Sequence, residues 1–231
     1  MMPSIRPLGD SAVIIQWSSA DDADISRSVR QLTDVLNAFG PSDSTSRFTA
    51  VVPAYTSITV HFCLSRMSFQ QAARIIEQGL SRTEDLLAGA PALIEIPVCF
   101  DEVFAPDLAD VAGRHHLKRD EVIRRFSDAE YSVRMLGFSP GFPYLSGLPT
   151  ELATPRRSSP RLKVPRGSVA IGGAQAGIYS QETPGGWHII GRTPLSLFRA
   201  ELARPCLLMA GDQVRFVPMS AEEFQRWQDE Q

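Results

Sequence analysis

Ser139 is the residue of this sequence whose surroundings most resemble those of a catalytic nucleophile. It lies in GFSPG, residues 137–141, which has the letters of the G-x-S-x-G pattern. In enzymes that use this pattern, the residue after the serine donates its backbone N–H to an oxyanion and opens a helix. Here that residue is Pro140, which has no N–H, and no helical pattern follows it. The sequence therefore predicts that Ser139 is not a nucleophile.

Basic residues are concentrated in the same part of the chain. Between Arg134 and Arg192 there are seven basic residues and only two acidic ones, Glu151 and Glu182. That segment carries a formal charge of +5, so the remainder of a chain with net charge −3 carries −8. A locally positive region on an acidic protein suits a small anion, although a solvated basic loop explains the charge equally well.

Glycine and proline are also concentrated in this region. Ten of the sixteen glycines fall between Gly137 and Gly191. Glycine lets the backbone take up a positive φ or approach a ligand, and proline stiffens a loop. Turns of a purely structural barrel would need the same residues. Three segments hold most of these glycines: GFSPGFPYLSGLP (137–149), GSVAIGGAQAGIYS (167–180) and TPGGWHIIGRTP (183–194).

Length and composition indicate a soluble globular protein that has no general affinity for nucleic acid. The chain has 231 residues, of which 43% are hydrophobic and 21% charged. It has no apolar run near the ~20 residues that a bilayer span requires, and no export signal, so we expect no membrane partner. Cys63, Cys99 and Cys206 are far apart and lack metal-type spacing, which favours reduced thiols, no metal site and a cytoplasmic location.

The first 89 residues predict a small α+β domain with two layers. Residues 12–17 and 56–62 have strand patterns, and the second alternates apolar with polar side chains. Ser68 and Gln71 form a capping-box pattern at the start of a helix. Another helix is predicted from apolar residues at helical spacing: Ile25, Val29, Leu32, Leu36 and Phe39.

The segment Gly89-Ala90-Pro91 is the predicted domain boundary. Beyond it we expect a mainly β barrel over residues 93–218 and a C-terminal tail over 219–231, with a capped helix near 220–227. Two short helices are expected near 107–117 and 119–128. Many short strands separated by turn residues favour a closed barrel. The predicted strands are 93–98, 131–138, 168–171, 188–190, 195–198, 206–209 and 213–217.

Several long segments, taken together, resemble one family. They are the three glycine-rich segments, TPRRSSPRLKVPRGS (154–168) and AGDQVRFVP (210–218). The chain is similar to the B subunit of bacterial 5-oxoprolinases, a family also known as allophanate hydrolase subunit 1. That family includes the kinase inhibitor KipI, and its sequence also forms part of the carboxyltransferase region of urea carboxylase. The resemblance is weak before Pro91 and strong from Leu93 to Pro218, and it implies a cyclophilin-like fold for the barrel.

The resemblance implies a hydrolase subunit that needs partners. In that family, three subunits, named A, B and C, together hydrolyse 5-oxo-L-proline to L-glutamate at the expense of ATP. A lactam carbonyl is a poor electrophile, and phosphorylation of its oxygen would activate it. The chain would then bind a small anionic substrate and help to stabilise the charge on the transferring phosphoryl group.

On that resemblance, His188 and Arg192 are the candidate catalytic residues. His188 would donate a proton, although a strand-end histidine that points to water explains it as well. Arg156, Arg157 and Arg161 would clamp an anion, or else lie on the surface or pair with Glu151. Other candidates are Gln175, Tyr179 and Thr193 for binding the substrate, and Ser139, Pro140, Phe142, Tyr144 and Trp187 as pocket walls.

Absent motifs limit what this chain contributes. It lacks a G-x-x-x-x-G-K-[ST] loop, so a Walker-type cradle for ATP is not expected. Lys163 has no flanking methionines and is no biotin-attachment site. Two other functions remain open: a KipI-like inhibitor of a histidine kinase, and one component of a urea- or allophanate-type amidohydrolase or carboxyltransferase.

Overall fold

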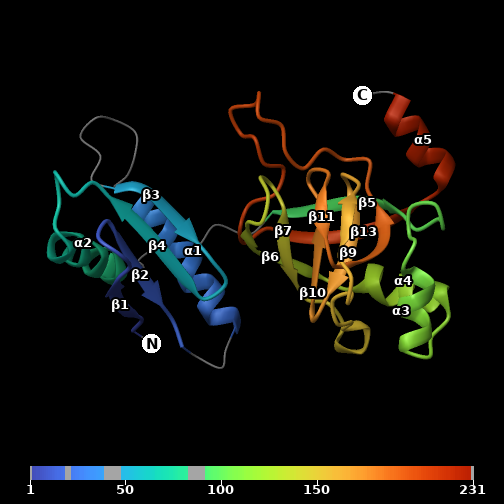
Figure 1. Cartoon of the computed structure of the whole chain (residues 1–231), viewed down its shortest axis with the longest axis horizontal. Coiled ribbons are helices and arrows are strands. Elements are labelled where there is room, and N and C mark those ends of the chain that lie inside the picture. The colour runs from blue at the N-terminus through green and yellow to red at the C-terminus, as the bar shows by residue number, and fades with distance from the viewer. Residues whose placement is uncertain (1, 19–21, 39–47, 83–91, 230–231) are drawn as a thin grey trace. The chain divides into compact units, whose positions relative to one another are not determined.

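The computed structural model describes residues 2–18, 22–38, 48–82 and 92–229. The chain forms two compact units, Met1–Ala90 and Pro91–Gln231, and each is described by itself (Figure 1). The predicted boundary at 89–91 lies outside the described residues. Among those residues, no helix combines the length and the apolar character that crossing a membrane requires.

The first unit is a four-stranded antiparallel sheet in the order β1-β2-β4-β3, packed against two helices. Its side chains at Ile58, Val60 and Phe62 are buried and alternate with more exposed ones, as the sequence predicts for a half-buried strand. The elements are β1 (Ser4–Pro7), β2 (Ala12–Gln16), α1 (Asp22–Ala38), β3 (Phe48–Pro53), β4 (Ser57–Phe62) and α2 (Phe69–Arg82).

The predicted capping box at the start of α2 is present. The backbone N–H of Ser68 donates to Oε1 of Gln71 at 2.8 Å, and the backbone N–H of Gln71 donates to Oγ of Ser68 at 3.3 Å. Each side chain thus satisfies a backbone donor that the helix leaves free. Helix α1 is confirmed through Ala38, and the predicted apolar position Phe39 lies outside the described residues.

The second unit is built on a closed barrel of seven strands in the order β10-β7-β6-β13-β5-β12-β9. Strands β5 and β13 pair in parallel, and the other pairs are antiparallel. A separate two-stranded sheet consists of β11 and β8. The strands are β5 (Leu93–Cys99), β6 (Tyr131–Leu136), β7 (Pro143–Ser146), β8 (Arg161–Val164), β9 (Ser168–Gly172), β10 (Gln175–Ile178), β11 (Thr183–Gly185), β12 (His188–Arg192) and β13 (Gln213–Met219).

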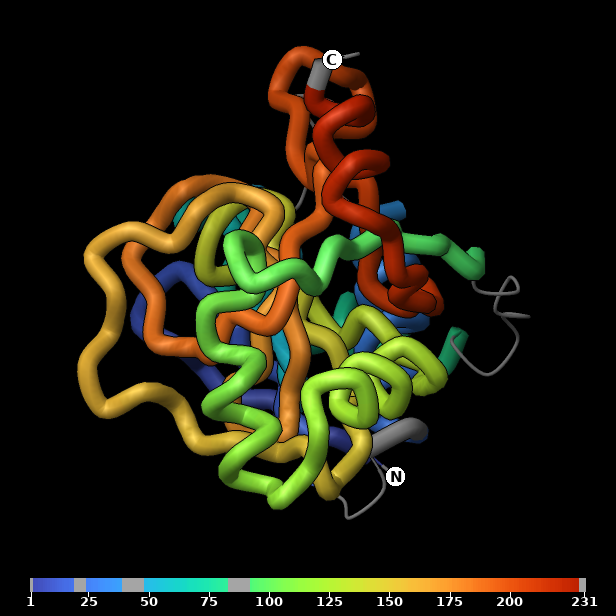
Figure 2. Tube along the Cα trace, turned by 90° about the vertical axis from the view of Figure 1, so that its right-hand side faces the viewer, coloured from blue at the N-terminus to red at the C-terminus, as the bar shows by residue number. Residues whose placement is uncertain are grey.

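Three helices accompany the barrel, and each contacts one of its strands. Helix α3 (Leu108–Arg114) contacts β12, α4 (Arg119–Asp128) contacts β13, and α5 (Ala221–Asp229) contacts β5. The predicted cap of α5 is present, because Oγ of Ser220 accepts from the backbone N–H of Glu223 at 3.1 Å. Phe224 on α5 is buried, and its ring centroid lies 4.3 Å from that of Phe104, in the segment that follows β5. Figure 2 shows the red helix α5 beside the green segment that contains β5.

Two predicted strands of the second unit are wrong. Residues 195–198 and 206–209 form a long loop, joined by an isolated bridge between Phe198 and Cys206. Among the described residues, only Phe198 and Cys206 pair across these two segments, so the bridge does not extend into a ladder. The loop is nevertheless fixed, because the N–H of Leu207 donates to the carbonyl of Leu197 at 2.9 Å and that of Arg199 donates to Pro205 at 2.8 Å.

Candidate functional site

An aromatic cluster covers the outer face of β9, β10 and β12. Its rings meet edge to face, with centroids 5.3 Å apart for Phe142 and Tyr179 and 5.7 Å apart for Phe142 and Trp187. Tyr144 lies 5.9 Å from Trp187, and Phe138 lies 5.4 Å from Phe142. Phe142, Tyr179 and Trp187 are buried, whereas Tyr144 is half-buried and Phe138 is 62% exposed. We call these five residues the aromatic face.

Glycines below the rings make this packing possible. A Cβ at Gly172 would overlap the indole of Trp187, and one at Gly177 would lie 2.8 Å from Phe142. A Cβ at Gly185 would overlap the phenol of Tyr179. Larger residues would lift the rings off the strands, so these glycines have a packing role that turn formation alone does not explain.

The loop 137–142 is held at one edge of the aromatic face. The N–H of Gly137 donates to the carbonyl of Phe142 at 3.1 Å, and Phe138 adopts a positive φ of 66°. Oγ of Ser139 lies 3.2 Å from Oγ of Ser180, which donates to the carbonyl of Pro140 at 2.6 Å. The hydroxyl of Ser139 thus contacts another hydroxyl that fixes the loop. Among the hydrogen bonds of the described residues, none joins this hydroxyl to a base.

Asp107, which the sequence did not indicate as a site residue, fixes the basic loop, residues 154–161, to the barrel. Its carboxylate accepts from Nη1 and Nη2 of Arg161 and from Nη1 of Arg157, each at 2.8 Å. The same carboxylate accepts from the backbone N–H of Ile189 at 2.7 Å, while its own N–H donates to the carbonyl of Ile189 at 3.0 Å. Asp107 is only 1% exposed. We call Asp107, Arg157 and Arg161 the ionic hub.

The carboxyl group of Asp107 stays ionised in this environment. Burial alone would raise its pKa, but hydrogen bonds from Arg161 and Ile189 and the charges of Arg161 and Arg157 outweigh burial. The net result is a pKa below the ordinary value of 3.8. Arg157 and Arg161 are therefore committed to an internal carboxylate. The alternative that they pair with Glu151 is wrong, because Glu151 pairs with Arg125 at 3.3 Å.

Arg156 belongs to the same loop, but its charge is available. Its guanidinium lies 5.8 Å from the centroid of Trp187, within the range of a cation–π contact, and the residue is exposed. The described residues offer it no ion pair. Gln175 in β10 pairs with Gly172 in β9, and the ring of Trp187 covers Gly172. The position of Gln175 in β10 is therefore next to Trp187. The structure thus brings Arg156, Gln175 and the aromatic face together.

His188 lies on the opposite side of β12 from the aromatic face, because successive side chains of a strand alternate between its two sides. Trp187 and Ile189 belong to the outer cluster, whereas Ile190 and Ile171, the register partner of His188, lie in the barrel core. His188 is only 3% exposed, and its Nε2 lies 3.0 Å from the carbonyl of Pro155. The alternative that it points to water is wrong. Its Nδ1 is buried without a hydrogen-bond partner among the described residues.

Burial of His188 predicts a specific dependence of stability on pH. Burial lowers its pKa from the ordinary value of 6.5, so the folded protein holds the neutral ring. The unfolded chain takes up a proton first as pH falls, and unfolding becomes easier between the unfolded and folded pKa values. We expect His188→Gln to lose less free energy of unfolding than the wild type as the pH falls below the ordinary histidine pKa of 6.5.

Urea denaturation at several pH values measures this difference. His116→Gln is the control for the loss of a histidine side chain, because His116 is exposed. Parallel pH curves for His188→Gln and the wild type would contradict a neutral, buried His188.

Arg192 and Thr193 lie at the end of β12, away from the aromatic face. Nε of Arg192 donates to the carbonyl of Arg166 at 2.9 Å, and its guanidinium lies 6.0 Å from the ring centroid of Phe224 on α5. Burial and then the charge of Arg166 lower the pKa of Arg192. Thr193 is buried, and its Oγ1 accepts from the N–H of Leu195 at 3.3 Å. Within the described ranges, no cluster of three metal-binding side chains occurs.

Comparisons with known proteins agree over nearly the whole chain. The family model described as "Carboxyltransferase domain, subdomain C and D" matches residues 3–208. The chain is 38% identical to the B subunit of 5-oxoprolinase from Bacillus subtilis, an alignment that covers 98% of this chain and 97% of that protein. It is 41% identical to the protein of the same name from Escherichia coli O157:H7, over 91% of this chain and 94% of that protein.

Solved structures show the same fold. TTHA0988 is 29% identical with a TM-score of 0.78, and the match covers 94% of this chain but only 41% of TTHA0988. The uncharacterized protein PH0987 from Pyrococcus horikoshii is 38% identical with a TM-score of 0.56, over 96% of this chain and 100% of PH0987. The fold is therefore found both as a chain of this length and as part of a longer one.

Proposed function

The chain belongs to the family of carboxyltransferase domains of subdomains C and D, and from this membership we propose that it is the B subunit of an ATP-dependent 5-oxoprolinase. The complex would hydrolyse 5-oxo-L-proline to L-glutamate. The observation that carries the proposal is the similarity, over nearly the full length of both chains, to proteins named as this component of 5-oxoprolinase. Such a component acts within a larger assembly, and we propose the A and C subunits as its partners.

The aromatic face and Arg156 suit the proposed substrate. At neutral pH, 5-oxoproline is a carboxylate attached to a small ring with apolar edges. Arg156 presents the paired N–H donors that bind a carboxylate, and the exposed ring of Phe138 and the half-buried ring of Tyr144 offer apolar contact. The side-chain amide of Gln175 can both donate to and accept from a lactam. Together these groups would bind and orient the ring.

The remaining chemistry requires more than this face provides. ATP would supply the phosphoryl group that activates the lactam oxygen. His188 is buried behind the strand, and Arg157 and Arg161 are bound to Asp107. These residues would support the site from within and leave proton transfer to a partner protein. The free thiols of Cys63, Cys99 and Cys206 suit a reducing compartment, and we propose the cytoplasm.

We expect the purified chain alone to release no glutamate from 5-oxoproline and ATP. The physical reason is that, in the part of the chain that the structure describes, the aromatic face offers a binding surface without an adjacent general base. The test is to co-express the chain with the A and C subunits, purify the complex and measure glutamate release, with urea as an alternative substrate. ATP-dependent hydrolysis by the single chain would contradict the need for partners. A pure, assembled complex that hydrolyses urea and leaves 5-oxoproline intact would overturn the proposed function.

A further inference from the structure

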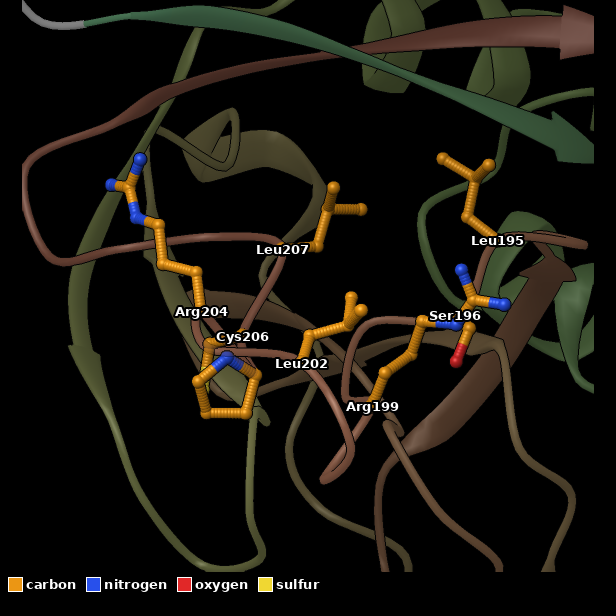
Figure 3. Close-up of a pocket in the computed structure, with 8 residues that line it drawn as sticks. Leu195, Ser196, Arg199, Leu202, Arg204, Cys206 and Leu207 are labelled. Carbon is orange, nitrogen blue, oxygen red and sulfur yellow. The ribbon is translucent and has the colours of Figure 1, made fainter.

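Two adjoining cavities lie beside the loop 194–207. The first, of about 560 Å³, is lined by Phe198 and mainly by polar and charged side chains: Arg166, Gln181, Ser196, Arg199 and Glu201. The second, of about 350 Å³, has a mainly apolar lining that includes Leu195, Leu202 and Leu207. Ser196 and Arg199 line both, so the two cavities meet at these residues (Figure 3).

The first cavity has positive charge that the described residues do not balance. Arg166 is exposed, and none of the ion pairs among the described residues includes it. Nε of Arg192 donates to the carbonyl of Arg166 at 2.9 Å, which places a second basic side chain next to Arg166. Arg199 pairs with Glu201 at 3.5 Å, but both side chains are more than half exposed. Such an exposed pair is weak and can yield to a stronger anion.

The second cavity offers a different surface. Figure 3 shows the side chains of Leu195, Leu202 and Leu207 around it, with the guanidinium of Arg199 beside Ser196 at its border. Leu202 is 47% and Leu207 is 41% exposed, so a bound apolar group would cover side chains that water now contacts. The hydrogen bonds within the loop hold these residues in place before any ligand arrives.

We propose that the two cavities form a binding site for a nucleoside triphosphate. The phosphate chain would lie in the first cavity, where guanidinium groups bind phosphate oxygens in pairs and the side-chain amide of Gln181 donates neutral hydrogen bonds. The base would lie against the leucines of the second cavity. Charged side chains would thus replace the backbone cradle of a Walker loop, which the sequence lacks. The choice of ATP as the nucleotide rests on the proposed function.

The position of this site also relates it to the aromatic face. Gln181 lines the first cavity, and Tyr179, two residues earlier, belongs to the aromatic face. Between them, the hydroxyl of Ser180 contacts Ser139 and fixes the loop that carries Phe138. Three consecutive residues therefore connect the proposed nucleotide site with the proposed substrate site.

Equilibrium binding to the purified full-length chain tests the proposal, with ATP, tripolyphosphate, inorganic phosphate and adenosine as probes. We expect Arg166→Ala and Arg199→Ala each to weaken the binding of ATP and of tripolyphosphate by about tenfold to a hundredfold. Leu202→Ser should weaken ATP and adenosine by roughly threefold to tenfold and leave tripolyphosphate unchanged. Arg215→Ala is the matched control, because Arg215 pairs with Glu95 at 3.4 Å on the surface of the barrel.

Three results would overturn the proposal. They are no ATP binding at about 10 mM, equal effects of Arg166→Ala and Arg215→Ala, and inorganic phosphate that binds as tightly as tripolyphosphate. The outcome is independent of the enzyme assay. ATP binding that depends on Arg166 in a chain whose complex leaves 5-oxoproline intact would uphold this site and reject the proposed function. An active complex whose ATP affinity is unchanged by Arg166→Ala and by Arg199→Ala would reject this site and uphold the proposed function.

Discussion

Asp107→Ala should destabilise the second unit by about 3 kcal/mol, one of the largest effects that a single substitution in it can have. The substitution leaves two guanidinium groups and the N–H of Ile189 without their shared acceptor. Removing one partner of a fully buried pair costs more, but Arg157 and Arg161 are 28% and 26% exposed and can regain water. In thermal unfolding, the midpoint of this unit should fall by roughly 10 °C.

The control for Asp107→Ala is Glu151→Ala. Glu151 also pairs with an arginine, at 3.3 Å, but its side chain is 49% exposed, and its loss should change stability by less than about 0.5 kcal/mol. Asp107→Asn retains an acceptor for Ile189 and should fall between the two. Equal stability of Asp107→Ala and Glu151→Ala would show that the ionic hub contributes nothing to the fold.

Local patterns predicted the elements that local interactions determine. The alternation in residues 57–62 and the capping boxes at Ser68 and Ser220 are confirmed because each depends on neighbours within a few residues. In the second unit, strands β7, β8, β10 and β11 were not predicted. They are three or four residues long, and two of them contain glycine, so pairing with distant residues, in the barrel or in the separate sheet of β8 and β11, decides their conformation.

The candidate site was predicted in part, for a related reason. The glycine-rich segments and the aromatic residues indicated which side chains pack together on the outer face of the barrel, because close packing of rings on a strand requires glycine beneath them. The role of Asp107 could not be found in the same way. Its partners Arg157 and Arg161 lie 50 and 54 residues away, and at the start of α3 it looks like a helix cap. In the structure, its side chain makes no capping hydrogen bond.

Arg156→Ala should reduce kcat/KM for 5-oxoproline by about tenfold to a hundredfold in the assembled complex. The variant removes a charge-assisted pair of hydrogen bonds to the substrate carboxylate, which is present in both the ground state and the transition state. The loss should therefore appear mainly as a higher KM. The fold should be unaffected, because Arg156 is exposed and the ionic hub holds its loop independently. Arg156→Lys keeps the charge without the planar pair of donors and should show a smaller loss.

The most direct test of the account is the KM for 5-oxoproline in complexes that contain wild-type, Arg156→Ala or Arg124→Ala chains. Arg124 is an exposed arginine on α4, paired with Glu121 and Asp128, and has no part in the proposed site. We expect a higher KM for 5-oxoproline in the Arg156→Ala complex and not in the other two, with the KM for ATP unchanged in all three. The same KM for 5-oxoproline in all three complexes would contradict the claim that Arg156 and the aromatic face bind the substrate.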